Sequence, residues 1–397
     1  MIIQIILSLF LGIIAGTFTG LTPGIHINLI GAILVSLSTG ILSSINPIFL
    51  VVFITAMAIA HTFIDFIPSI FLGCPDTNTE LSILPGHELL KQGHGYQAVL
   101  LTAYGGLAAI FILLLITFPS ILILSHFYDD IQKIIPYILI ILSGILILLE
   151  NKKFQAMLVF FLTGFLGWSV LNLELSQPLL PLLTGLFGAS SLILSIKTNP
   201  QIPKQKIVKP KINIIKPVIG ALLASPICSF LPGLGSGQAA IIGYTFSLNK
   251  EDKRGFLVLL GAVNILVMGL SFVSLYAISK TRTGAAASIK EILSGNILLS
   301  HLIIMLITVL ISGLISFYLT CALSKFCSEN INKINYSKMS IITLIVLVII
   351  VGLISKFSGL LVFIITTLTG IYCISLGVRR TNMMGCLLIP TIIYYLF

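Results

Sequence analysis

Long apolar runs separated by short polar segments fill most of the 397-residue chain. A membrane-spanning helix needs about 20 mostly apolar residues, and runs of roughly that length recur in both halves of the sequence. We therefore predict an all-α polytopic membrane protein with five spanning helices in each half. The predicted spans are 47–71, 98–124, 134–150, 154–172, 178–196, 255–279, 292–323, 339–354, 358–377 and 382–397.

Two further apolar stretches, about 5–42 and 217–249, are each interrupted near the middle by Pro-Gly. The interruptions are Pro23-Gly24 and Pro232-Gly233, which lie 209 positions apart (232 − 23). A helix broken inside a bilayer leaves backbone N–H and C=O groups without partners, which is tolerated where they line a protected cavity. We interpret both stretches as re-entrant helical hairpins, a feature typical of transporter binding sites. A Pro-Gly pair taken singly is also compatible with a simple kink.

The two halves also resemble each other in short matches. Leu162–Gly164 reads Leu-Thr-Gly and recurs as Leu368–Gly370 at an offset of 206 (368 − 162). Because each half has an odd number of crossings, the second copy would be inverted relative to the first. We predict two inverted-topology repeats, 1–196 and 217–397, joined by a basic, Pro-rich cytoplasmic linker, 197–216.

Composition and charge agree with this class of protein. Hydrophobic residues make up 57% and charged residues 9% of the chain, whereas soluble domains carry about 25% charged residues. The net charge of +10 does not indicate nucleic-acid binding, because the basic residues occupy short loops, as the positive-inside rule describes. Only segment 280–290 places its cations outside. We expect a multi-pass protein of the cell membrane with a retained N-terminal segment.

The hairpins are the predicted substrate site. A half-helix that begins after Pro-Gly presents free N–H groups and the positive end of its dipole, which favours an anion such as a carboxylate. Glycines would let that anion reach the backbone, although His26 is also compatible with a hydrogen-bonded core role. The predicted residues are Thr22, Pro23, Gly24, His26 and Asn28 on the first hairpin, and Pro232, Gly233, Gly235, Ser236, Gly237 and Gln238 on the second.

Other polar residues extend this site. Asp76, Thr77 and Asn78 precede a third Pro-Gly, at Pro85-Gly86, and offer oxygen atoms as ligands. Arg282 is expected to face a carboxylate, and Asn264 to supply an uncharged ligand. A solvated loop explains the same residues, but a site is favoured because the polar run lies next to both an apolar helix and Pro85-Gly86.

His61 and Asp65 lie four positions apart and therefore share one face of the helix 47–71. An acid within an apolar segment is a functional hypothesis, because inserting its ionised form costs about 3 kcal/mol. We expect Asp65, with His61, to bind a coupling proton or sodium ion. The alternative is that Asp65 lies near the helix end and pairs with His61 or caps a neighbouring segment.

The order of these features resembles the large membrane subunit of the tripartite tricarboxylate transporters, the TctA-like family. In that family an early Pro-Gly motif precedes a polar segment with a short helix, and a Leu-Pro-Gly-x-Gly motif follows in the later half. The corresponding residues here are Pro23-Gly24, segment 73–97 and Leu231–Gly235. Departures at Cys74–Asp76 and Gly377–Asn382 indicate a divergent, archaeal-type branch. The resemblance implies tricarboxylate transport with a small membrane subunit and a soluble solute-binding protein.

The sequence thus predicts a secondary active transporter that moves a small organic anion, a carboxylate, by alternating access with Na⁺ or H⁺ coupling. An ATP-binding loop of the form GxxxxGK[ST] does not occur. The six cysteines show no CxxC spacing, so we expect neither a metal site nor another cofactor. The expected surroundings are the lipid bilayer and no nucleic acid, and a homodimer is compatible with the sequence.

Two other function classes fit the sequence less well. An intramembrane serine protease based on Ser236 would need glycine two positions earlier, where the chain has Leu234, and an aspartyl Gly-x-Gly-Asp motif does not occur. A channel, or an exporter of a lipid or polymer precursor, would show a continuous polar face along several helices. Because the polar residues gather at the helix breaks instead, a discrete binding site is favoured and an enzyme is not expected.

Overall fold

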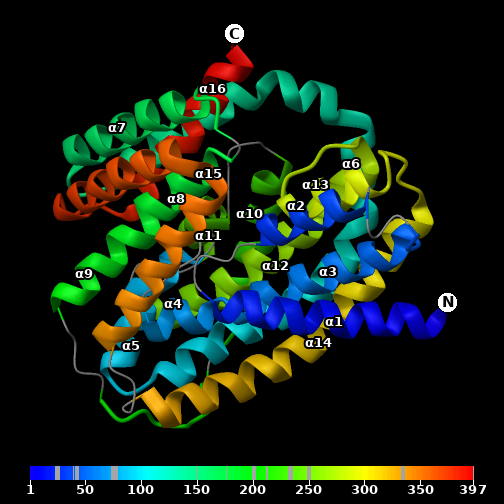
Figure 1. The fold of residues 1–397 in the computed structure, drawn as a ribbon, viewed down its shortest axis with the longest axis horizontal. Coiled ribbons are helices and arrows are strands. Elements are labelled where there is room, and N and C mark those ends of the chain that lie inside the picture. Colours follow the sequence, from blue (N-terminus) through cyan, green and yellow to red (C-terminus); the bar gives the residue numbers. More distant parts are fainter. Residues whose placement is uncertain are drawn as a thin grey trace.

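A computed structural model gives the fold of the chain and describes all residues except 23–26, 39, 41–43, 73–78, 149, 176, 199–202, 212, 231–235, 248–251, 332–335 and 397. The described residues form helices and no strand (Figure 1). Seven of these helices are long and apolar enough to cross a membrane. The predicted all-α polytopic fold is therefore confirmed.

The first half contains a series of helices that alternate long and short. In chain order they are α1 (Ile2–Leu21), α2 (Ile27–Ser38), α3 (Pro47–Ile64), α4 (Phe66–Leu72), the 3₁₀ turn η1 (Glu80–Ser82), α5 (Ile83–Lys91), α6 (Gly95–Leu148), α7 (Lys153–Leu171), α8 (Leu179–Leu183), the π-helical turn η2 (Thr184–Ala189) and α9 (Ser190–Thr198).

The second half also combines long and short helices. Its helices are α10 (Ile215–Phe230), α11 (Ser236–Ser247), α12 (Lys253–Ile278), α13 (Gly284–Ile292), α14 (Leu299–Asn330), α15 (Tyr336–Ser375), the 3₁₀ turn η4 (Arg380–Met384) and α16 (Gly385–Leu396).

The spans expected at 98–124 and 134–150 both lie in α6, as the apolar stretches Gly95–Tyr128 and Pro136–Leu148. The 54-residue helix contains Pro119 and Pro136 and continues between the two stretches. One predicted boundary was wrong. The span expected from residue 292 begins at Leu299, because Ser294 and Gly295 have φ values of 51° and 76° and end α13. A left-handed backbone of this kind is incompatible with continuing a helix.

α3 and α12 form the centre of one helical unit. In the span formed by α3 and α4, 78% of the most apolar 18-residue stretch is buried inside the protein. The corresponding share in α12 is 89%. α1 and α14 pack against α3, and α6 and α10 pack against α12. Small residues permit these close approaches, as is usual between membrane helices: a Cβ at Gly105 on α6 would collide with the backbone of Val258 on α12.

A second unit has its own apolar core and lies beside the first (Figure 1). α7 packs against α16, and α15 packs against η2 and α9. A Cβ at Gly167 on α7 would collide with the backbone of Cys386 on α16, and one at Gly185 with Thr366 on α15. Each half of the sequence therefore supplies helices to both units.

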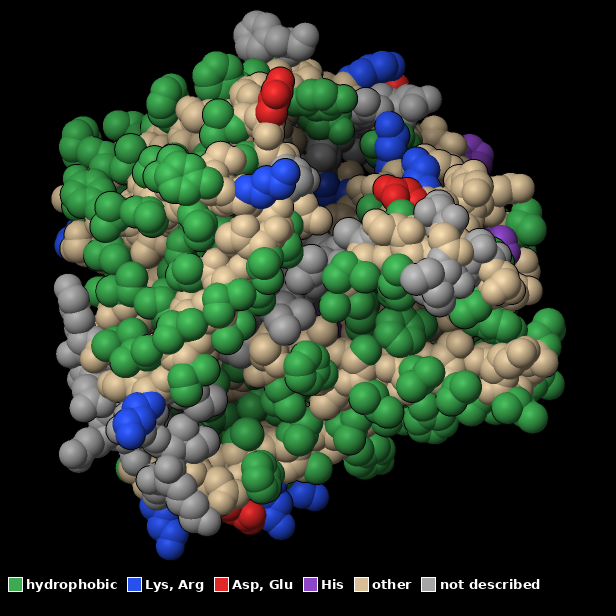
Figure 2. All heavy atoms as spheres, in the orientation of Figure 1, with side chains coloured by type: hydrophobic (Ala, Val, Ile, Leu, Met, Phe, Trp, Pro, Cys, Tyr) green, Lys and Arg blue, Asp and Glu red, His purple; other side chains and the backbone are tan. Residues whose placement is uncertain are grey.

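The outer surface is apolar. Large hydrophobic side chains such as Leu115, Leu353 and Tyr394 are 76%, 79% and 78% exposed. Figure 2 shows hydrophobic side chains spread across one face, with few charged side chains between them. This surface suits the hydrocarbon of a bilayer, which accounts for large apolar side chains that would be unfavourable in water.

Candidate functional site

Arg282 lies at the break of the second hairpin. Its Nε donates to the carbonyl of Ser229 and its Nη2 to the carbonyl of Cys228, both at 3.0 Å. These carbonyls are near the end of α10, which stops at Phe230, one residue before the stretch 231–235 that lies outside the described residues. A guanidinium at a helix C-terminus is stabilised by the carbonyl dipoles.

Arg282 keeps its charge in this position. Burial lowers the pKa of Arg282 to about 10, which is still far above neutral pH. The side chain also lies within electrostatic range of Tyr395 on α16 and Tyr128 on α6. A positive charge is therefore held where α10, α6 and α16 approach one another.

The segment that carries Arg282 also touches the first hairpin. Two residues after Arg282, α13 begins, and it packs against α2, the second arm of that hairpin. Gly31 on α2 faces Ser288 on α13 so closely that a Cβ there would collide with the serine hydroxyl. The stretch 282–292 thus contacts α10 of one hairpin and α2 of the other.

The end of α1 in the first hairpin is bound by His61. The His61 Nδ1 lies 3.0 Å from the Thr19 Oγ1, and both residues are buried. The Thr22 hydroxyl donates to the carbonyl of Phe18 at 2.8 Å and so closes the last turn of α1. His61, predicted as a coupling residue, therefore lies against the arm that precedes Pro23.

Asp65 occupies the junction between α3 and α4, where it is 4% exposed. Its carbonyl accepts a hydrogen bond from the Ser69 hydroxyl at 2.7 Å, and that hydroxyl lies 2.6 Å from the Thr79 Oγ1. Ser69 and Thr79 connect this junction to the end of the polar segment 73–78. α3 and α4 together form one candidate membrane span, Pro47–Leu72, in agreement with the predicted span 47–71, and this span contains a turn at Asp65.

Asn264 lies within α12 and is 3% exposed. Neither its Oδ1 nor its Nδ2 forms a hydrogen bond among the described residues. The hydroxyls of Ser225 and Ser229 on the neighbouring α10 are also buried and form no hydrogen bond among the described residues. Buried polar groups normally have partners, so these three side chains provide unused donors and acceptors beside the second hairpin.

Of the residues predicted on the second hairpin, Ser236 and Gly237 are described by the structure. They begin α11 and are buried. The remaining hairpin and loop predictions lie outside the described residues, or have side chains that do: Pro23, Gly24, His26, Asn28, Asp76, Thr77, Asn78, Pro232, Gly233, Gly235 and Gln238.

Sequence reasoning missed Thr19, Ser225 and Ser229. Each is a small hydroxyl residue within an apolar helix, a residue type that membrane helices also use for close packing. Their spacing of three to seven positions before a Pro-Gly is the only signal that singles them out.

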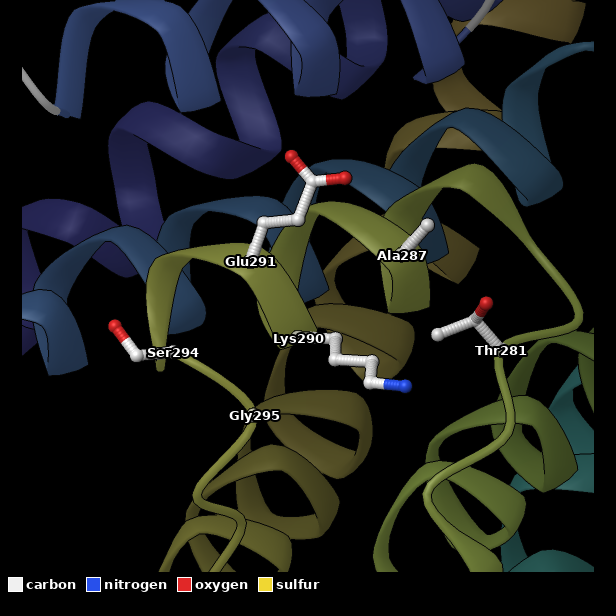
Figure 3. Close-up of a pocket in the computed structure, with 6 residues that line it drawn as sticks. All are labelled: Thr281, Ala287, Lys290, Glu291, Ser294 and Gly295. Carbon is white, nitrogen blue, oxygen red and sulfur yellow. The ribbon is translucent and has the colours of Figure 1, made fainter.

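An open depression of about 410 Å³ lies beside α13, and Arg282 is not among the residues that line it. Thr281, Ala287, Lys290, Glu291, Ser294 and Gly295 line it (Figure 3). The Lys290 Nζ donates to the Ser279 carbonyl at 2.8 Å. Figure 3 shows Lys290 extending toward Thr281, whereas Glu291 points away from Lys290. Because the depression is shallow and its cation is already bonded, the helix breaks remain the better candidate site.

The broken helices and the apolar surface define a multi-pass membrane transport protein. A model of the tripartite tricarboxylate transporter TctA family matches residues 6–385, and the chain belongs to this family. It is 35% identical over 360 residues to the uncharacterized protein MJ1079 of Methanocaldococcus jannaschii, covering 87% of this chain and 88% of that protein. No solved structure matches the chain. The family is one of transporters, so the protein is not an enzyme.

Proposed function

We propose that the protein moves a small organic anion bearing carboxylate groups across the membrane by alternating access, coupled to Na⁺ or H⁺. The observation that carries this proposal is the placement of stretch 282–292, which contacts both hairpins and holds the charge of Arg282 at one of them. Charged groups within a membrane protein generally mark the pathway of a substrate or ion.

The anion site would combine charge with neutral donors. Arg282 would supply the positive charge, and the amide of Asn264 and the hydroxyl of Ser236 would donate hydrogen bonds. The first turn of α11 would add the backbone N–H groups of its N-terminus. The proposed site includes the predicted residues of both Pro-Gly stretches and of segment 76–78.

Inverted duplication belongs to the same proposal. α2 and α11 each contain 12 residues and begin 209 positions apart (236 − 27), and α5 and α13 each contain nine. In the proposed repeats α3 corresponds to α12 and α6 to α14. The packing follows this correspondence, because α6 packs on α12 and α14 packs on α3. These matches support two repeats, 1–196 and 217–397, with the linker 197–216 inside the cell.

Coupling would involve the first hairpin. His61 binds α1 through Thr19, and Asp65 lies one helical turn further along, at the α3–α4 junction. Protonation or sodium binding at these residues would change the charge beside the break, which provides a route from ion binding to hairpin position. The family description also supports partner subunits; we propose a small membrane subunit and a soluble solute-binding protein, with a homodimer as one assembly.

The test is a thermal-shift screen of the purified protein against di- and tricarboxylates, with and without sodium. A ligand that binds only the folded state raises its stability, by about 2.7 kcal/mol at 100 times its Kd. We expect a carboxylate-specific rise in Tm that Arg282→Gln abolishes and Arg282→Lys retains in part. Lys290→Gln, which removes a cation on the same stretch, should keep the full response.

Two outcomes would contradict the proposal. A wild-type Tm that no carboxylate raises would exclude the substrate class, and a full response in Arg282→Gln would exclude this residue from the site. Carboxylate flux into proteoliposomes that needs no ion gradient, and that does not saturate with carboxylate concentration, would favour the channel alternative instead.

A further inference from the structure

The linker between the halves is anchored to the body of the protein by one buried side chain. Residues 203–211 form a segment without helix or strand, and Gln205 within it is 8% exposed. The Gln205 Oε1 accepts from the backbone N–H of Gly95 at 2.8 Å, and its Nε2 donates to the carbonyl of Leu90 at 3.1 Å. The N–H of Lys206 donates to the carbonyl of Gly93 at 2.8 Å. This segment therefore has a defined position against the α5–α6 turn.

The outward side of the same segment is basic and apolar. Lys204, Lys206, Lys209 and Lys211 are all exposed, and residues 203–211 contain no acid. None of the four lysines forms an ion pair among the described residues. Between them, Ile207 is 41% and Val208 54% exposed.

Neighbouring aromatic residues indicate the depth of this segment in the membrane. Lys209 lies within electrostatic range of Cys321 on α14. On that helix Tyr318 is 71% and Phe326 63% exposed, three positions before and five after Cys321. Trp and Tyr side chains gather at membrane–water interfaces, so the exposed Tyr318 indicates that this part of α14, and the segment near it, lie at the level of the lipid headgroups.

We propose that residues 204–211 form a binding surface for the anionic headgroups of bilayer lipids. The lysines meet the phosphate charge, and Ile207 and Val208 enter the apolar boundary beneath it, the arrangement by which basic segments next to a membrane attract anionic lipid. Because Gln205 fixes the segment to α5 and α6, bound lipid stabilises the folded state through that turn. Glu88 on α5 pairs with Lys253 at the start of α12 and extends the connection to the central helix.

The experiment compares the intact protein in nanodiscs of phosphatidylcholine alone and of phosphatidylcholine with phosphatidylglycerol. We expect the anionic lipid to raise the Tm of the wild type by several degrees and 1 M NaCl to remove most of that increase, since the screening length is then about 3 Å. The double variant Lys206→Gln/Lys209→Gln should lose at least half of the rise in Tm that the anionic lipid causes.

The matched control is Lys153→Gln/Lys338→Gln, which removes the same charge from two other exposed sites on the side predicted to be cytoplasmic. It should keep the full increase, and equal losses in both double variants would overturn the proposal in favour of a general charge effect. Inorganic phosphate is added to the phosphatidylcholine nanodiscs as a further arm. A similar rise in Tm with phosphate would show a soluble anion site and not a lipid surface.

Discussion

At the scale of single residues, Lys356 is the most strained backbone position within a described helix. Its φ of 54° and ψ of −158° divide α15 into two helical segments. This conformation is nearly restricted to glycine and costs other residues about 1–3 kcal/mol. The sequence predicted separate spans at 339–354 and 358–377, so the break was expected, although its sharpness was not.

Replacing Lys356 by glycine should therefore stabilise the protein by about 1 kcal/mol, because the relief of strain exceeds the entropy cost of glycine. Thermal unfolding in detergent measures this effect. Lys356→Ala is the matched control, since it removes the same side chain but keeps a Cβ in the strained conformation. A gain of equal size in both variants would attribute the effect to the loss of the lysine side chain.

Asn264 permits a second test at this scale. A buried amide without a hydrogen-bond partner costs about 1–3 kcal/mol, so Asn264→Leu should leave the ligand-free Tm unchanged or raise it. The same variant should reduce the carboxylate-dependent rise in Tm, because the amide is proposed to bind the anion. A fall of more than about 2 kcal/mol without ligand would instead indicate that the amide has a structural partner.

At the scale of helices, close packing at glycine decides how α6 approaches α12. A Cβ at Gly105 would collide with the backbone of Val258, and one at Gly261 with the backbone of Thr102. The contact is therefore made by backbones on both sides, and neither helix can accommodate a larger residue by moving a side chain.

We expect Gly105→Val to destabilise the protein by about 3 kcal/mol or more, since overpacking against a backbone cannot relax. Gly144→Val on the same helix is the control, because a Cβ there meets nothing within 4 Å. The fraction of monodisperse protein and its Tm report the result. Equal behaviour of the two variants would contradict the packing of α6 on α12.

Most helices could be predicted from sequence because a membrane span must be apolar over a defined length. That rule reports polarity and not backbone conformation, so it separates the spans 98–124 and 134–150 although α6 is helical between them. The site was predictable in part. Arg282 was a candidate for its charge, but its partners are backbone carbonyls 53 and 54 positions away. Because every residue has a backbone carbonyl, the sequence does not indicate which ones bind an arginine.

At the scale of the whole molecule, the proposed inverted repeats place the linker and the 280–290 segment on opposite sides of the membrane. Lys209→Cys should then react with an impermeant maleimide only in inverted vesicles, and Lys290→Cys only in intact cells. The unmodified chain, with its six cysteines, provides the background. Labelling of both positions from one side would contradict the topology.

The exchange of helices between the halves also has a consequence for biosynthesis. Gly167 packs against the backbone of Cys386, 219 positions later (386 − 167). At about 5–20 residues per second, the ribosome needs about 10–45 s to reach that partner. During this interval the face of α7 that packs on α16 lacks that partner. The second unit can therefore close only after the second half of the chain has been synthesised, and a chain that stops after its first half cannot form it.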